Sequence, residues 1–172
     1  DLWVGTFHAT CARLLRRYHE AIGIKKDFVI YDEADQRAMI GRVLKDLGLD
    51  EKRWPPKTIA HAIEKAKQEV IGPDKFETND VVTEIVAKVY CAYEERMQSA
   101  GALHFGDLIF RLVTATEKIP EVKEALGTRF DHVLVDEFQD TNRVQYELVA
   151  KFADATRNLT VVGDDDQSIY AW

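Results

Sequence analysis

The chain has 172 residues, a length that fits one domain or one domain carrying a large insertion. Hydrophobic residues make up 46% and charged residues 31% of it, values typical of a globular protein, and no apolar run reaches the roughly 20 residues of a membrane span. The net charge of −7 argues against a non-specific nucleic-acid clamp, because such proteins are basic.

The two cysteines, Cys11 and Cys91, lie far apart and lack the CxxC spacing of a metal or redox site. Each falls within a helical pattern, so we expect both to be buried, reduced thiols. Reduced thiols are typical of a cytoplasmic protein, and no signal peptide is visible at the first residues. We therefore expect a cytoplasmic location and no contact with a membrane.

Residues 6–22 are predicted to form one amphipathic helix. Apolar side chains recur there at spacings of three and four, while arginines take the other faces, and Gly23 suits the C-terminal cap. The arginines at positions 13, 16 and 17 most simply form a solvated face.

A series of further helices is predicted between residues 24 and 126. Residues 32–47 form the first of them, with Asp32 as N-cap and Gly48 as terminator. The other helices are indicated by apolar side chains at helical spacing over residues 59–70, 82–97, 108–113 and 120–126.

The pattern changes after residue 126. The segment 133–135 is β-branched and lacks helical spacing, residues 144–152 again suit a helix, and residues 159–162 are strand-like. Strand, helix and strand in this order predict a parallel βαβ unit. The expected fold class is therefore α/β, interrupted by a large all-helical block and mostly helical overall.

Asp136 and Glu137 directly follow the first of these strands. Ligands of open parallel sheets bind beyond the carboxyl ends of the strands. An Asp at this edge can hold Mg²⁺ together with substrate phosphates, and the adjacent Glu can orient and polarise an attacking water. The alternative is that both residues only cap the following turn.

The second acidic segment, residues 163–168, follows the second strand. Gln167 can hydrogen-bond a phosphate and report its presence, whereas Gly-Asp-Asp-Asp is also good turn chemistry. The spacing does not fit an EF-hand calcium loop. Tyr170 and Trp172 can stack on unpaired bases, or they can pack in the core.

Thr6, Phe7 and His8 lie at a turn from extended chain into helix. Backbone N–H groups and the Thr6 hydroxyl there can hold a phosphate, although simple helix capping by Thr6 explains the pattern better.

Together these segments resemble a superfamily 1 DNA helicase of the UvrD/PcrA/Rep type. Residues 5–8 and 14–16 resemble motif Ib, residues 133–142 (VLVDEFQDTN) resemble motif II, and residues 161–172 (VVGDDDQSIYAW) resemble motif III. Residues 50–56 and 105–108 resemble parts of the helical insertion called 1B. The order and spacing of motifs II and III make this resemblance specific.

The resemblance implies a role for each matching residue. Asp136 would coordinate the Mg²⁺ of MgATP, Glu137 would activate the hydrolytic water, and Gln167 would sense the γ-phosphate. The single strand would be contacted by Thr6, Phe7, His8, Tyr170 and Trp172.

The resemblance also implies a division of the chain and a set of partners. Residues 1–23 and 108–172 would belong to the first RecA-like domain of a P-loop NTPase, and residues 24–107 would be the helical 1B insertion. The whole protein would translocate 3′ to 5′ on single-stranded DNA and unwind duplex at a junction, in DNA repair or replication. Its partners would be that DNA and the remaining helicase domains.

The chain departs from the family in what it lacks. It contains no GxxxxGK[ST] loop to cradle phosphates, and no second motor domain, so we expect a helicase fragment that is inactive by itself. Two other hypotheses stay open on the residues alone. One is a metal-dependent nuclease or phosphatase that uses Asp136, Glu137, Asp140 and residues 164–166. The other is a non-catalytic helical interaction module.

Overall fold

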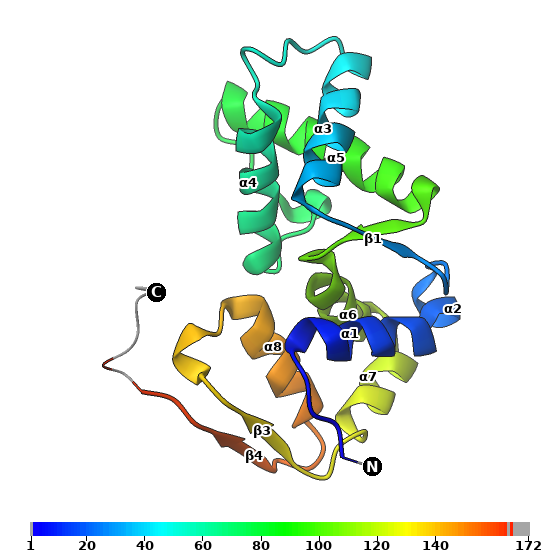
Figure 1. Ribbon diagram of the computed structural model, residues 1–172, viewed down its shortest axis with the longest axis vertical. Helices are drawn as coiled ribbons and strands as arrows, with labels where there is room; N and C mark the ends of the chain where they lie inside the picture. Colours follow the sequence, from blue (N-terminus) through cyan, green and yellow to red (C-terminus); the bar gives the residue numbers. More distant parts are fainter. Residues whose placement is uncertain (1, 165, 167–172) are drawn as a thin grey trace.

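The computed structural model describes residues 2–164 and residue 166. Its elements form two groups that meet at a short parallel ribbon (Figure 1). The upper group contains the helices α3 (Glu33–Asp46), α4 (Pro56–Gln68) and α5 (Val81–Ala100). The lower group combines the other α-helices with the strands β3 (Val133–Val135) and β4 (Leu159–Val161).

The N-terminal helical segment consists of two helices, so the prediction of one helix over residues 6–22 is wrong. Thr6 caps α1 (Phe7–Arg17), because its Oγ1 accepts a hydrogen bond from the N–H of Ala9 at 3.2 Å. The backbone of Tyr18 leaves the helical region, with φ −104° and ψ 20°, and its ring packs against the core. The short α2 (His19–Ile22) follows and ends at Gly23, whose φ is 75°.

The helices of the upper group begin at capping residues. Asp32 is the N-cap of α3, as predicted, and its Oδ1 accepts hydrogen bonds from the N–H groups of Ala34 and Asp35 at 2.8 and 2.9 Å. Asp80 caps α5 in the same way through Thr83. These caps satisfy N–H groups that a helix leaves without internal partners. The 3-10 helix η1 (Pro73–Lys75) connects α4 to α5.

Two short strands, which the helical patterns did not predict, join the two groups. β1 (Val29–Tyr31) leads from the lower group into α3, and β2 (Ala102–His104) leads from α5 into α6 (Asp107–Lys118). They pair in parallel, with Val29 opposite Ala102 and Tyr31 opposite His104. The chain thus enters and leaves the upper group along one ribbon (Figure 1).

The lower group contains the predicted βαβ unit. The strands β3 and β4 pair in parallel, with Val135 opposite Val161, and α8 (Arg143–Phe152) connects them. The 3-10 helix η2 (Phe138–Asp140) lies between β3 and α8. With α7 (Pro120–Gly127), these elements make a mostly helical α/β fold with small parallel sheets, which confirms the expected fold class.

The buried apolar side chains form two clusters, one in each group. The lower cluster is built mainly from α1, α6, α7 and α8 and includes Leu14, Leu15, Leu108, Leu112, Val122 and Leu148. The upper cluster is built from α3, α4 and α5 and includes Ile40, Leu44, Ile63, Val89, Tyr93 and Met97. Each group therefore buries an apolar core of its own, which is the main favourable contribution to its folding.

A buried ionic cluster joins α4 and α5 to α6. Lys67 on α4 forms ion pairs with Asp107 of α6 and with Glu94 of α5, the latter at 2.6 Å. The second oxygen of Asp107 accepts a hydrogen bond from the N–H of His104 at 2.8 Å, and Glu94 also accepts one from Arg111 at 2.6 Å. Asp107 thus has a donor on each oxygen, whereas Glu94 has one hydrogen-bond donor, Arg111, and an ion pair with Lys67. Each buried carboxylate faces at least one cation, as a buried charge requires.

The cluster shifts the pKa values of Lys67 and Asp107. Burial by itself lowers the pKa of Lys67, but the Asp107 and Glu94 carboxylates outweigh it and hold the pKa above its ordinary value. Burial likewise raises the pKa of Asp107, but Lys67 outweighs it and holds the pKa below its ordinary value. Both groups therefore stay charged at neutral pH.

The two cysteines have different surroundings. Cys11 is buried, as predicted, and burial raises the pKa of its thiol. Cys91 is exposed, which contradicts the prediction, because α5 turns that residue away from the apolar face formed by Tyr90 and Tyr93. Within the described residues, no helix is both long enough and apolar enough to cross a membrane.

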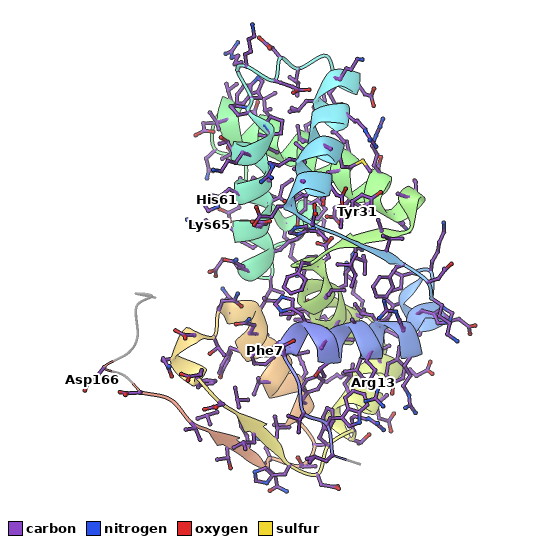
Figure 2. All side chains as sticks on the ribbon, in the orientation of Figure 1. Phe7, Arg13, Tyr31, His61, Lys65 and Asp166 are labelled. Atoms are coloured by element: carbon purple, nitrogen blue, oxygen red, sulfur yellow. The ribbon has the colours of Figure 1, made fainter. Side chains whose placement is uncertain are left out.

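Replacing Lys67 by Met should destabilise the protein strongly, because the carboxylates of Asp107 and Glu94 would stay buried without their cation. The expected loss is about 3–5 kcal/mol in the free energy of unfolding, measured by chemical denaturation at pH 7. Lys65→Met is the matched control, since Lys65 lies on the same helix and points into solvent (Figure 2). Equal stability of the two variants would contradict a structural role for the cluster.

Acidification gives a second measurement on the Lys67→Met variant. In the wild type the stabilisation from Asp107 is present above the unfolded pKa of the carboxyl group and is lost as the pH falls through the lower folded pKa. In the variant, Asp107 gains its proton at higher pH because the Lys67 ammonium group that lowers its pKa is missing. The stability difference between wild type and variant should therefore shrink on acidification.

Candidate functional site

The first part of the site lies where β3 and β4 end. Main-chain hydrogen bonds continue past the strands, from the N–H of Val162 to the oxygen of Val135 at 2.8 Å and from the N–H of Phe138 to the oxygen of Val162 at 2.9 Å. The loop after β3 is thereby held against the chain that follows β4. Carboxylates placed in these two loops share the carboxyl edge of one parallel sheet, where ligands of such sheets bind.

Asp136 and Glu137 occupy the loop after β3 and are both exposed. The N–H of Glu137 donates to Oδ1 of Asp136 at 3.0 Å, so one oxygen of this exposed carboxylate is bonded to the backbone. Glu137 has a positive φ of 51°, a left-handed conformation that costs free energy for a residue with a side chain. A strained residue at the end of a strand is typical of a functional position.

This pair of carboxylates fits a magnesium site of the kind that nucleotides occupy. Mg²⁺ keeps several waters and needs one or two protein carboxylates in addition to substrate phosphates, so the exposed Asp136 is sufficient as its protein ligand. Within residues 2–164 and 166, no group of three or more His, Cys, Asp or Glu side chains could hold a metal ion.

The second loop is described only in part. Gly163 and Asp164 are close to the first loop, because the N–H of Asp164 donates to Oε1 of Gln139 at 3.1 Å. Asp166 is exposed, and its N–H donates to Oδ1 of Asp164 at 3.0 Å (Figure 2 labels Asp166). The predicted site residues Gln167, Tyr170 and Trp172 lie outside the described residues.

The second part of the site lies at the start of α1. The ring of His8 stacks on the ring of Phe105, with 3.8 Å between their centroids and 17° between their planes. Burial lowers the pKa of His8, which favours the neutral ring. Thr6 caps the helix, which is the structural role that the alternative predicted for it. Phe7 packs partly against the lower core.

Phe105 is a residue that the sequence analysis did not single out as a contact. It lies just beyond β2, half of its side chain is exposed, and it comes next to His8 only through the fold. The sequence gives no signal for this contact, because the strand β2 that brings Phe105 next to His8 was not predicted. Together His8 and Phe105 present a stacked aromatic pair at the surface.

An open cavity of about 500 Å³ lies beside this pair, between α1, β1, α4 and α8. Its walls combine aromatic and polar side chains, among them His8, Tyr31, Glu64, His104, Phe105 and Gln145. His104 and Glu64 approach one another there, at 3.7 Å between Nε2 and Oε1.

Helix α8 connects the two parts of the site. Its N-cap is Asn142, whose Oδ1 accepts from the N–H of Gln145 at 3.1 Å, while the N–H of Asn142 donates to Oε1 of Gln145 at 2.9 Å. Both residues line the cavity beside His8, and both follow η2 and the loop of Glu137 directly. The carboxylate loop is thus continuous with one wall of the aromatic cavity.

Comparison with known proteins identifies the family. All of residues 1–172 match the UvrD/REP helicase N-terminal domain. The chain is 41% identical to ATP-dependent DNA helicase PcrA of Bacillus subtilis (strain 168), with 100% of the chain and 24% of that protein covered. It is 42% identical to the protein of the same name from Staphylococcus aureus (strain NCTC 8325 / PS 47), with 99% of the chain and 24% of that protein covered. The chain spans about a quarter of the length of these relatives, and it belongs to the UvrD/REP helicase N-terminal domain family.

Proposed function

We propose that this chain is part of the first motor domain of an ATP-dependent DNA helicase. The observation that carries the proposal is the pair Asp136 and Glu137 at the carboxyl edge of the parallel strands β3 and β4, in a chain of this family. Family membership favours this function over a nuclease, a phosphatase or a non-catalytic module. The whole protein would move 3′ to 5′ on single-stranded DNA and unwind duplex.

The carboxylate loops would perform the ATP hydrolysis. Asp136 would hold Mg²⁺ through its other oxygen, and Mg²⁺ would neutralise charge on the phosphates of bound ATP. Glu137 would accept the proton of the attacking water, since its exposed carboxylate lies next to Asp136 at the same edge of the sheet. Gln167 would sense the γ-phosphate from the loop after β4.

The stacked rings and the cavity would lie on the path of the single strand. His8 and Phe105 together offer an aromatic surface on which an unpaired base can stack. Thr6 and Phe7 would contribute through the backbone at the start of α1, where free N–H groups attract phosphate. Tyr170 and Trp172 would extend the same track.

The division of the chain forms part of the same proposal. Residues 24–107 would be the helical 1B insertion, and residues 1–23 and 108–172 would belong to the RecA-like domain. The two separate apolar clusters support this division. The remaining helicase domains and single-stranded or junction DNA would be its partners, in DNA repair or replication in the cytoplasm.

Glu137→Gln should abolish ATP hydrolysis in the full-length protein that carries this chain. The amide keeps the size of the side chain but cannot accept the proton, so turnover should fall about 10²- to 10⁴-fold while MgATP binding persists. Phosphate release with saturating single-stranded DNA measures the first quantity, and fluorescent-nucleotide titration measures the second. Glu121→Gln, at an exposed position of α7, is the control. Near-normal turnover of Glu137→Gln would contradict the proposed function.

Phe105→Ala should weaken single-strand binding without unfolding the protein. Loss of one stacking ring should cost about 1–3 kcal/mol in affinity for an oligonucleotide, measured by fluorescence anisotropy. The thermal unfolding midpoint should change little, because half of the side chain is already exposed. Val82→Ala, at a similarly exposed apolar position of α5, is the control. Unchanged DNA affinity of Phe105→Ala would contradict a stacking role.

A further inference from the structure

Gln139 in η2 connects the two loops of the carboxylate site through its side chain. Its Nε2 donates to Oε2 of Glu137 at 2.5 Å, and its Oε1 accepts from the N–H of Asp164 at 3.1 Å. The partners determine the orientation of the amide, because a carboxylate only accepts and a backbone N–H only donates. One side chain therefore bridges Glu137 and the chain that follows β4.

The neighbouring Gly163 makes this bridge possible. A Cβ at position 163 would lie 2.6 Å from Oε1 of Gln139, 3.3 Å from the nitrogen of Gln139 and 3.4 Å from the nitrogen of Phe138. The first distance is far below a normal contact, so any side chain here would displace the Gln139 amide. The missing side chain at this position therefore lets the Gln139 amide lie against the chain that follows β4.

Glu137 needs such a partner. Its side chain is exposed and has several rotatable bonds, so without a restraint it would sample many rotamers. Among residues 2–164 and 166, Gln139 is the one side chain that donates a hydrogen bond to its carboxylate. A group that takes a proton during a reaction has to be held in a narrow range of positions by its neighbours.

We propose that Gln139 is a positioning residue for the hydrolytic reaction. It holds the Glu137 carboxylate in place and ties that position to the backbone of Asp164, three residues before Gln167 in the sequence. A displacement of the loop after β4 would thus move the Gln139 amide and, through it, Glu137. This inference rests on the proposed function of the carboxylate site.

The test uses three variants of the full-length protein that carries this chain. Gln139→Leu removes both hydrogen bonds, Gln139→Glu keeps an acceptor for Asp164 but loses the donor to Glu137, and Gly163→Ala displaces the amide without changing it. Gln98→Leu, the same substitution on an exposed position of α5, is the control. The measurements are kcat of DNA-stimulated ATP hydrolysis, Kd for MgATP and the thermal unfolding midpoint.

Each of the three variants should lower kcat on the order of tenfold to a hundredfold, the range expected when a reacting group is misplaced. The Kd for MgATP and the unfolding midpoint should stay near their wild-type values, because Gln139 contacts Glu137 and not Asp136. Gln139→Leu and Gly163→Ala should also be non-additive, since both break one bridge. Additive losses, or losses in kcat matched by losses in affinity, would overturn the inference.

Glu137→Gln in the same assays separates this inference from the proposed function. If the wild type hydrolyses ATP, Glu137→Gln is inactive and Gln139→Leu retains normal kcat, the positioning role is overturned and the proposed function stands. If the wild type does not hydrolyse ATP, or if Glu137→Gln retains turnover, the proposed function itself fails. Wild-type activity with reduced kcat in all three bridge variants supports both.

Discussion

The burial of Lys67 among carboxylates determines how the two groups of helices fit together. A buried ammonium group is costly unless it is paired, and here its partners come from two other helices, Asp107 of α6 and Glu94 of α5. Apolar contacts tolerate small shifts, whereas these ion pairs require α4, α5 and α6 to meet at fixed points. Asp107 also accepts from the backbone at the end of β2, so the same carboxylate orients the turn into α6. We infer that this cluster contributes specificity of packing more than net stability.

The second constraint acts at the carboxyl edge of β3 and β4. The strands contribute only three residues each, but their hydrogen bonds continue through Val162 to Phe138, and Gly163 allows the loops to touch. In this arrangement the backbone of Glu137 is left-handed, and its side chain accepts a hydrogen bond from Gln139. The close approach also brings a proposed ATP-handling loop into continuity with α8, whose first turn lines the aromatic cavity. The proposed ATP hydrolysis at the carboxylate loops and the proposed DNA contact at the cavity would therefore be connected by a short stretch of chain, η2 and the first turn of α8.

The sequence predicted those features that depend on local patterns. Helical spacing located the long helices, Asp32 was recognisable as a cap, and the β-branched segment before Asp136 was recognisable as a strand. Features that depend on distant partners were missed. β1 and β2 are three residues long, and the whole upper group separates them in the sequence. The stacking of Phe105 on His8 likewise exists only in the folded chain. Cys91 was placed in the core because periodicity alone cannot tell the edge of an apolar helix face from its centre.

The ribbon of β1 and β2 has a mechanical consequence. β1 leads from the lower group to the upper one, and β2 leads from the upper group to the lower one. The two strands nevertheless point in the same direction in space, because they pair in parallel. Because extended backbone is close to its maximum length, a shift of the upper helices along the ribbon in either direction would stretch one of the two strands. A rotation about the ribbon axis is opposed by other contacts, those that α4 makes with α6 and α8. Among these contacts, the ion pair of Lys67 with Asp107 joins the upper helices to α6.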